Sequence, residues 1–304
     1  MSDSRPILIA GKRGRVAQDL VAAAARHGVD VRALGRPELD VEASDTIARA
    51  IATHAPCAIV NAAAVGTFDE AERDPAHAFA LNRTGPAHLA AAARQAGIPF
   101  VHISTDAVFD GSKRAPYVED DPVAPLSTYA RSKAEGEQAV LDADPSALVV
   151  RTAWVLGPHG ANFLTAMLRL AASQEEARVV SDQHGTPTVG ADLARTLFAM
   201  VARLVRDRGA IAPGIYHVAN TGVTSWLGVA EAIFAGWARR GQRVPRIVPI
   251  RLADWPSPAQ RPLYSALDCG KVARVFGIAM PRWEDSLEQC LDELASAARA
   301  ASRS

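Results

Sequence analysis

The chain has 304 residues and carries 33 basic and 33 acidic side chains, with an isoelectric point of about 7.1. This balance leaves no long-range field that would attract nucleic acid or an anionic membrane, so we exclude both as partners. The three cysteines are far apart, and neither a signal peptide nor a membrane-spanning stretch is recognisable, so we expect a soluble cytoplasmic protein.

Short apolar runs alternate with helical segments in the first half of the chain. Five strands are predicted, at residues 6–10, 29–34, 57–61, 99–104 and 147–151. The first helix, 14–28, ends at Gly28, because glycine is the usual residue after a helix. This alternation predicts an α/β fold, a Rossmann-type doubly wound parallel sheet with helices on both faces.

The alternation loosens after Arg151. Two helices at 191–205 and 225–240, a strand at 214–220 and a last helix from about Trp283 are predicted, with 241–268 mostly loop. No internal repeat or flexible linker separates these segments. We predict an NAD(P)-binding domain over residues 1–150 and a smaller C-terminal lobe over 151–304, with segments near 190–220 returning to the first domain.

A glycine turn follows the first strand directly and opens the first helix. Residues 11–17 read G-x-x-G-x-x-A. Gly11 would allow a tight turn, Gly14 would let backbone amides approach a pyrophosphate, and Ala17 would let the helix pack closely on the strand. The pattern predicts a dinucleotide site; the alternative is a turn that only connects two elements.

The end of the second strand predicts which dinucleotide binds. A site for NAD commonly has an acidic residue there, which binds the ribose 2′-hydroxyl, but this chain has Gly35 and Arg36. A guanidinium can bind a 2′-phosphate through two parallel hydrogen bonds. We therefore predict NADPH, with NADH as the alternative cofactor; Arg36 could instead be a solvated loop residue.

A tyrosine and a lysine lie four residues apart in a predicted helix. Tyr129 and Lys133 would share one helix face, near Thr105 at the end of the fourth strand. An ammonium beside a phenol lowers the phenol's pKa, which suits it to exchange a proton with a carbonyl oxygen during hydride transfer. The alternative is an exposed i,i+4 pair on a surface helix.

Together these segments resemble the extended short-chain dehydrogenases and, more narrowly, the dTDP-4-dehydrorhamnose reductase family. The matching segments run in family order from residue 5 to about 295, and they include "VNAAA" (60–64), "STDAVFDG" (104–111), "PLSTYARSKAEGE" (125–137), "RTAWVLG" (151–157), "DQHGTPT" (182–188) and "PSPAQRPLYSALD" (256–268). The resemblance implies NADPH-dependent reduction of the C4 keto group of a nucleotide-linked 4-keto-6-deoxy sugar, dTDP-4-dehydro-L-rhamnose first among them. It also implies that the C-terminal lobe binds the nucleotide sugar.

The resemblance assigns roles by position. Tyr129 would protonate the C4 oxygen, Lys133 would lower the pKa of Tyr129 and hold the nicotinamide ribose, and Thr105 would hydrogen-bond the carbonyl. The residues implied to bind the cofactor are Gly11, Gly14, Arg15, Val16, Arg36, Asp40, Val41, Ala62, Ala63, Ala64, Tyr129 and Lys133. Those implied to bind the substrate are Thr105, Asp106, Ala107, Trp154, Asn162, Arg261 and Ser265; for Trp154, packing in the core is an equal alternative.

Three positions depart from the family, which has tyrosines where this chain has Val65, Ala107 and Leu156. The change beside Thr105 predicts a roomier, less polar wall around the sugar. A reductase of a different nucleotide-linked 4-keto sugar therefore stays an alternative, as does a noncatalytic NADP-binding regulatory protein. The histidines show no metal-ligand spacing, so no metal is predicted, and the sequence leaves a homodimer open.

Overall fold

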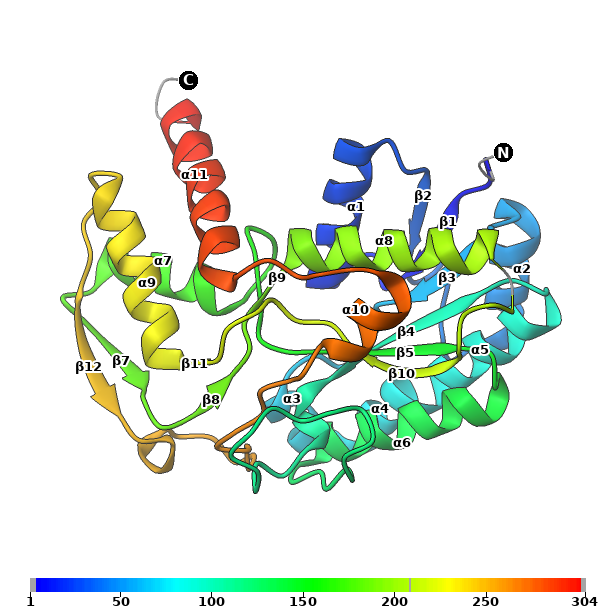
Figure 1. Cartoon of the computed structure of the whole chain (residues 1–304), viewed down its shortest axis with the longest axis horizontal. Helices are drawn as coiled ribbons and strands as arrows, with labels where there is room; N and C mark the ends of the chain where they lie inside the picture. Colours follow the sequence, from blue (N-terminus) through cyan, green and yellow to red (C-terminus); the bar gives the residue numbers. More distant parts are fainter. Residues whose placement is uncertain (1–3, 208, 302–304) are drawn as a thin grey trace.

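A parallel sheet of six strands lies at the centre of the computed structural model, which describes residues 4–207 and 209–301 (Figure 1). Its strands follow the order β10-β5-β4-β3-β1-β2, and every neighbouring pair is parallel. The strands are β1 (Ile7–Ala10), β2 (Val31–Leu34), β3 (Ala58–Asn61), β4 (Phe100–Thr105), β5 (Leu148–Thr152) and β10 (Gly214–His217). The predicted doubly wound α/β fold is confirmed.

Helices cover both faces of this sheet, as Figure 1 shows. On one face lie α1 (Arg15–His27), α8 (Gly190–Arg206) and α10 (Gly270–Phe276), packed on strand residues such as Ile9 and Val150. On the other lie α2 (Ser44–His54), α5 (Gly85–Gln95) and α6 (Thr128–Ala143), packed on residues such as Leu8 and Val149. Successive strand residues point to opposite faces, so these apolar runs supply both cores.

A run of short helices joins β3 to α5. It consists of α3 (Phe68–Arg73), α4 (Pro75–Phe79) and the π-helical turn η1 (Ala80–Thr84). Within it, the buried Asn82 accepts a hydrogen bond from the backbone amide of Val65 and donates one to Ser132 Oγ on α6. These bonds hold the run against α6 and bring Phe68 to the carboxyl end of the sheet.

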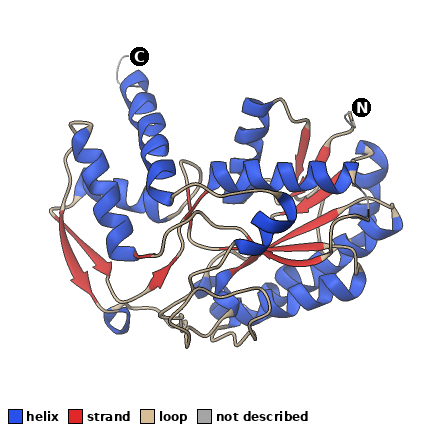
Figure 2. Cartoon of the chain, in the orientation of Figure 1, coloured by secondary structure: helices blue, strands red, loops and turns tan. Residues whose placement is uncertain are grey.

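The smaller C-terminal lobe consists of helices and short strands (Figure 2). It has its own apolar core, which includes Leu164, Ile233 and Leu291. Its three two-stranded sheets pair β7 with β12, β8 with β11 and β6 with β9. Its elements are β6 (Val155–Leu156), α7 (Phe163–Ser173), β7 (Glu176–Val180), β8 (His184–Gly185), β9 (Thr188–Val189), β11 (Thr224–Ser225), α9 (Trp226–Arg239), β12 (Arg246–Ile250) and α11 (Trp283–Ala301). Two single turns complete the fold, η2 (Asp106–Val108) and η3 (Leu252–Asp254).

Two segments beyond residue 151 belong in space to the first part of the chain. Helix α8 packs against α1, and β10 pairs in parallel with β5 at the edge of the main sheet. The division of the chain near residue 150 stays a prediction.

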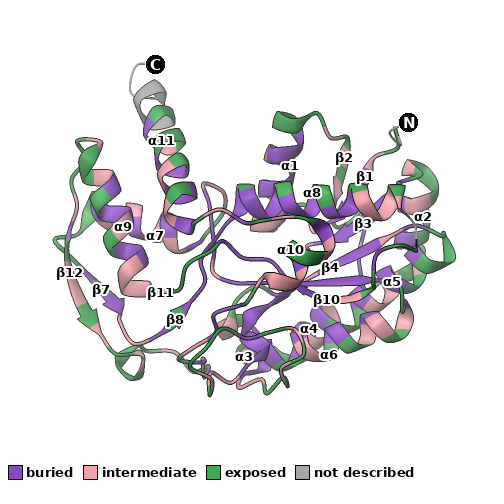
Figure 3. Cartoon of the chain, in the orientation of Figure 1, coloured by how far each residue is buried: buried purple, intermediate pink, exposed green. Residues whose placement is uncertain are grey.

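Within the described residues, no helix is both long and apolar enough to span a membrane. Figure 3 shows that the central strands are mostly buried and that exposed residues lie on the outer faces of the helices.

Asp19 is a buried carboxyl group at the contact between α1 and the start of α8. A Cβ atom at Gly190 would lie 2.0 Å from Asp19 Oδ2, so only glycine leaves room for this carboxyl group. Oδ2 has no hydrogen-bond partner, and burial raises the pKa of Asp19 to about 7, although the charge of Arg15 opposes the shift. The folded chain therefore disfavours the carboxylate form.

We expect Asp19→Asn to stabilise the protein at alkaline pH. The unfolded carboxyl ionises with a pKa near 3.8 and the folded one near 7, so the wild type loses stability as pH rises between these values. At pH 8 the variant should gain about 2–4 kcal/mol, and at pH 4 this gain should vanish. Urea unfolding at both pH values measures this difference in stability. The control is Asp45→Asn, since Asp45 is exposed and pairs with Arg49 at the surface. An equal difference at both pH values would contradict a buried, protonated Asp19.

Candidate active site

The glycine turn between β1 and α1 forms one wall of a cavity of about 320 Å³ at the carboxyl end of the sheet. Gly11 has φ of +102°, and a Cβ atom there would lie 2.6 Å from the backbone nitrogen of Ala63. Gly14 caps α1 without a side chain, which leaves the first amides of the helix free for an anion. The predicted cofactor residues that line this cavity are Gly11, Gly14, Arg36, Asp40, Val41, Ala62, Ala63 and Ala64.

Two further basic residues at this cavity were missed in the sequence analysis. Lys12 and Arg13 line it together with Arg36, and Lys12 pairs with Glu38 at 3.7 Å, both side chains being about half exposed. Gly35 lies beside Lys12, because a Cβ atom added at Gly35 would be 3.4 Å from Lys12 Cβ. The basic dipeptide within the glycine turn was the available signal. The three cations suit an additional phosphate group.

A second cavity of about 430 Å³ shares Arg13, Gly14, Ala62 and Ala64 with the first, so the two are continuous. Ten further predicted residues meet here, from both parts of the chain: Arg15, Val16, Thr105, Asp106, Ala107, Tyr129, Lys133, Trp154, Arg261 and Ser265. Residues that line it and were not predicted include Thr67, Phe68 and Phe163. Residues distant in sequence thus converge on one space next to the glycine turn.

Tyr129 lies in the first turn of α6, which Ser127 caps by accepting a hydrogen bond from the amide of Ala130. Its ring packs on Phe68 with 4.9 Å between the centroids, and its side chain hydrogen-bonds that of Thr105. Burial raises the pKa of Tyr129, and the bond to Thr105 opposes this. The lowering predicted from the sequence is wrong for this structure.

Lys133 lies one turn further along α6 and is 2 % exposed. Its Nζ donates to the carbonyl oxygen of Ile103 at 2.7 Å and lies 3.2 Å from His102 Nε2. Burial lowers the pKa of Lys133 to about 8, with the charge of Glu137 opposing. The ammonium is therefore directed at β4 and disfavoured by burial, which explains why it does not lower the pKa of Tyr129.

Asp106 connects the end of β4 to the C-terminal lobe. Ser265 Oγ donates to its Oδ2, and Thr105 Oγ1 donates to its Oδ1 at 3.1 Å. Burial raises the pKa of Asp106 to about 6, with these hydrogen bonds opposing. Thr105 and the lobe residue Ser265 are thus joined through one buried carboxyl group.

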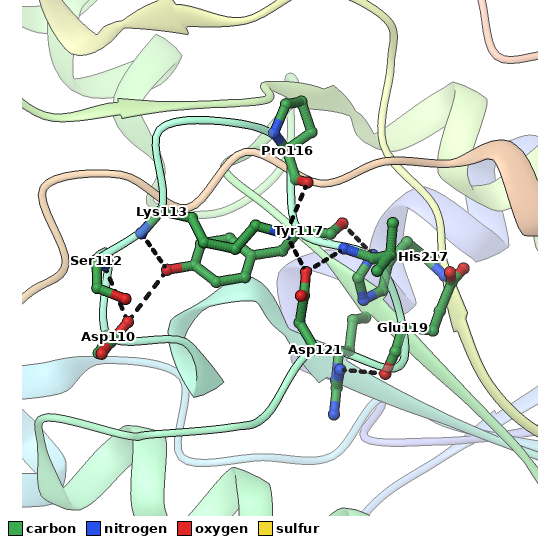
Figure 4. A network of polar contacts seen from close by, with 10 residues as sticks. Asp110, Ser112, Lys113, Pro116, Tyr117, Glu119, Asp121 and His217 are labelled. Carbon is green, nitrogen blue, oxygen red and sulfur yellow. Dashed lines mark hydrogen bonds and ion pairs between the residues drawn. The ribbon is translucent and has the colours of Figure 1, made fainter.

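The segment after β4 is held to the edge strand β10 by the polar network in Figure 4. The Tyr117 hydroxyl donates to Asp110 Oδ1, and the backbone amide of His217 donates to Glu119 Oε1. His217 Nδ1 lies 3.1 Å from the carbonyl oxygen of Tyr117, so this nitrogen carries the proton. Burial lowers the pKa of His217 to about 3, so the ring stays neutral in the network.

An aromatic wall closes the lobe side of the second cavity. Trp154 and Trp226 stack with 3.7 Å between ring centroids and 5° between planes, and Phe163 packs on Trp226 at 4.5 Å. Trp226 Nε1 donates to Gln183 Oε1 at 3.0 Å, which fixes its ring. A flat, fixed aromatic surface suits stacking of a planar ring.

Arg261 reaches the same cavity from the lobe. Its guanidinium lies 4.8 Å over the ring of Phe68 and 3.7 Å from Asp69 Oδ1, and burial lowers its pKa although Asp69 opposes this. Its Nε has no hydrogen-bond partner, and neither has Nε of Arg15, whose Nη1 donates to the carbonyl oxygen of Ala161. Two half-buried cations with unused donors suit anionic groups in this space.

Asn162 lies outside both cavities. It is the N-cap of α7 and forms a capping box with Thr165, and its Nδ2 donates to the carbonyl oxygens of Gly157, His159 and Gly160. Its amide is fully used within its own loop, so the structure gives it a structural role where the sequence predicted substrate binding. Within residues 4–207 and 209–301, no three His, Cys, Asp or Glu side chains are arranged to hold a metal ion.

The two cavities form a dinucleotide-sized space above a doubly wound sheet, and this space opens onto a helix with a Tyr-x-x-x-Lys pair. This combination defines an extended short-chain dehydrogenase/reductase. The family model described as "RmlD substrate binding domain" matches residues 5–296. The chain belongs to the dTDP-4-dehydrorhamnose reductase family, as the relatives that carry this name also indicate.

Three comparisons illustrate the similarity. The dTDP-4-dehydrorhamnose reductase of Sinorhizobium fredii is 41% identical over 280 residues, covering 92% of this chain and 94% of the relative. That of Burkholderia thailandensis is 40% identical over 296 residues, covering 95% and 99%. The structure of dTDP-4-dehydrorhamnose reductase from Bacillus anthracis, solved in complex with NADP, has a TM-score of 0.87 and 30% identity, covering 95% and 99%.

Proposed function

We propose that the chain uses NADPH to reduce the C4 keto group of dTDP-4-dehydro-L-rhamnose, which gives dTDP-L-rhamnose. The observation that carries the proposal is the meeting of Thr105, Tyr129 and Lys133 in a cavity that continues into the glycine turn. The names of the relatives and the NADP in the Bacillus anthracis structure support this substrate and this cofactor. We expect the reaction to take place in the cytoplasm, and a homodimer of the chain stays a prediction.

In this proposal NADPH supplies the hydride for C4. The buried hydroxyl of Tyr129 donates its proton to the C4 oxygen, and Thr105 orients that oxygen by a hydrogen bond. Burial raises the pKa of Tyr129, so the hydroxyl is protonated at neutral pH and has a proton to donate. Lys133 faces the same cavity and would hold the nicotinamide ribose.

The two half-buried guanidinium groups, of Arg15 and Arg261, fit the two diphosphates that the reaction brings together. Arg15, in the first turn of α1, would bind the cofactor's diphosphate with the free amides after Gly14. Arg261 would bind the diphosphate of the nucleotide sugar through its unused Nε. Trp154 would then offer its ring to the thymine or the sugar.

The test is NADPH consumption by the purified protein with the dTDP-linked 4-keto-6-deoxy sugar of L-lyxo configuration, beside a GDP-linked 4-keto sugar. Rapid turnover of the dTDP sugar alone would support the proposal. Turnover of the GDP sugar would favour the alternative of a different nucleotide-linked substrate. NADPH binding without any turnover would favour the noncatalytic regulatory alternative, and other nucleotide sugars would be screened next.

We expect Gly35→Asp to shift the cofactor preference from NADPH toward NADH. The new carboxylate would lie beside Lys12 and Arg36, where it would repel a 2′-phosphate and accept a hydrogen bond from a ribose hydroxyl. The ratio of kcat/KM for NADPH to that for NADH should fall about tenfold or more, since 1.4 kcal/mol corresponds to a factor of ten. Gly35→Ala adds only a methyl group and is the control. An unchanged ratio would show that Gly35 lies away from the 2′-position.

A further inference from the structure

Gln183 precedes β8 and bonds to two parts of the second cavity, the aromatic wall and the segment that carries Arg261. The residue is buried, with 6 % of its surface exposed. Its Oε1 accepts a hydrogen bond from Trp226 Nε1 at 3.0 Å, and its Nε2 donates to the carbonyl oxygen of Pro262 at 2.9 Å. One amide thus joins the wall to the residue that follows Arg261.

The chemistry of the two partners fixes the orientation of this amide. An indole N–H can only donate and a proline carbonyl can only accept, so Oε1 must face Trp226 and Nε2 must face Pro262. Turning the amide would place two donors together on one side and two acceptors together on the other. Both contacts therefore depend on the carboxamide group of Gln183.

On the wall side, Gln183 acts on Trp154 through Trp226. The two indole rings stack with 3.7 Å between centroids, so a fixed Trp226 also fixes one face of Trp154. The same segment supports Trp154 directly, since a Cβ atom at Gly185 would lie 2.7 Å from Trp154 Cε2. Trp154 has φ of +46°, a left-handed backbone that costs free energy in a residue other than glycine and recurs at ligand sites. The wall therefore has one orientation before a ligand binds.

On the other side, the side chain of Gln183 extends a backbone pairing. The amide of His184 donates to the carbonyl oxygen of Leu263 at 2.8 Å. Pro262 comes before this pairing and has no amide proton, so its carbonyl oxygen is the group through which Gln183 holds it. Arg261 is the next residue toward the N-terminus. Gln183 thereby anchors the backbone beside Arg261.

We propose that Gln183 is a positioning residue that sets the distance between the aromatic wall and Arg261, so that the ring and the diphosphate of one nucleotide sugar are bound together. The inference rests on the proposed function, in which Trp154 meets the thymine or the sugar and Arg261 meets the diphosphate. Both polar atoms of the Gln183 amide already bond to protein groups, so its effect passes through these partners.

The link from the lobe to the reacting groups does not depend on Gln183. Ser265 Oγ donates to Asp106 Oδ2, and the amide of Ser265 donates to the carbonyl oxygen of His184. Neither bond involves the Gln183 side chain. A variant of Gln183 should therefore raise KM for the nucleotide sugar and leave kcat nearly constant.

The experiment compares Gln183→Met with the wild type, using the whole protein in the presence of NADP⁺. Methionine keeps the length of the side chain and removes its acceptor and its donor. Calorimetric titration gives Kd for thymidine and for dTDP, and the ratio of the two is the gain in affinity from the diphosphate. We expect this ratio to fall about tenfold or more in Gln183→Met, because a displaced Arg261 no longer meets the diphosphate of a nucleotide bound at the wall.

NMR spectra without a ligand read the two contacts separately. In Gln183→Met, the Nε1–H signal of Trp226 and the Nε–H signal of Arg261 should both shift; Trp226→Phe and Arg261→Lys assign them. In the wild type, the Trp226 indole proton should exchange with solvent about tenfold or more slowly than that of Trp255, which is 43 % exposed. This last measurement needs no variant, so it remains if Gln183→Met fails to fold.

Thr196→Val is the matched control. Thr196 is buried at 2 % exposure, its hydroxyl donates to Met280 Sδ, and neither residue lines the two cavities. The variant removes a buried hydrogen bond elsewhere in the fold. It should leave the ratio of the two Kd values and both NMR signals unchanged.

Three results would overturn the inference: an unchanged ratio in Gln183→Met, an Arg261 signal that does not move, or a Trp226 proton that exchanges as fast as that of Trp255. An equal loss of thymidine and dTDP binding gives the first of these, since Gln183 would then serve the wall alone. If the wild type bound no dTDP, the proposed substrate would fail, while the two signals would still decide whether Gln183 holds the wall and Arg261.

Discussion

Tyr129→Phe is expected to lower kcat for reduction of the dTDP-linked keto sugar by about 10³-fold, within the range that general acid catalysis contributes. The substitution removes the hydroxyl that would protonate the C4 oxygen and keeps the ring, so its packing on Phe68 stays in place. KM for the sugar and the affinity for NADPH should therefore change little. Steady-state kinetics with both substrates, together with a fluorescence titration of NADPH binding, separates the loss of chemistry from a loss of binding.

Tyr216→Phe provides the control for this variant. Tyr216 is also buried, but its hydroxyl donates to the carbonyl oxygen of Ala212 on the far part of the sheet edge and lines neither cavity. Its removal should cost about 1 kcal/mol of stability and leave kcat unchanged. If Tyr129→Phe kept wild-type turnover, Tyr129 would not be the proton donor. Loss of activity in both variants would indicate a general effect on folding.

Much of the main sheet could be predicted because its strands are local patterns. β1, β3, β4 and β5 are short, buried apolar runs between helical segments, and each begins and ends within one residue of its prediction. The β7–β12 pair could not be predicted in this way, because β12 includes Pro249 and the exposed Arg246 and pairs only with β7. Strands of two residues carry no period at all, so the small sheets of the lobe depend on tertiary contacts.

The site was predictable where backbone or chemistry demands one residue type. Gly11 and the Tyr129–Lys133 pair are of this kind. Phe68 and Phe163 were missed because their role depends on the direction in which the fold turns their side chains. Of the three departures from the family tyrosines, Val65 and Leu156 are buried outside both cavities and only Ala107 lines the second, so the change around the sugar is confined to one position.

Glu137→Gln is expected to lower the free energy of unfolding by about 3–5 kcal/mol, the usual cost of removing one partner of a buried ion pair. Arg151 donates to both carboxylate oxygens, through Nε at 2.9 Å and Nη2 at 2.6 Å, and Ser104 Oγ donates to Oε1. The side chains of Arg151 and Glu137 are only 2% and 5% exposed. A neutral amide would leave the Arg151 charge buried between α6 and β5 without a counter-charge.

Glu135→Gln is the matched control on the same helix. Glu135 pairs with Arg83 at the surface, where both side chains are about half exposed, so its loss should cost less than about 1 kcal/mol. Urea unfolding of the three proteins at neutral pH gives the comparison. Equal costs for the two variants would mean that another acceptor compensates Arg151. The carbonyl oxygen of Glu119, in the network of Figure 4, is a candidate, since it lies 3.5 Å from Nη1. The expected difference would instead show that one buried pair fixes α6, the helix that carries Tyr129 and Lys133, on the sheet.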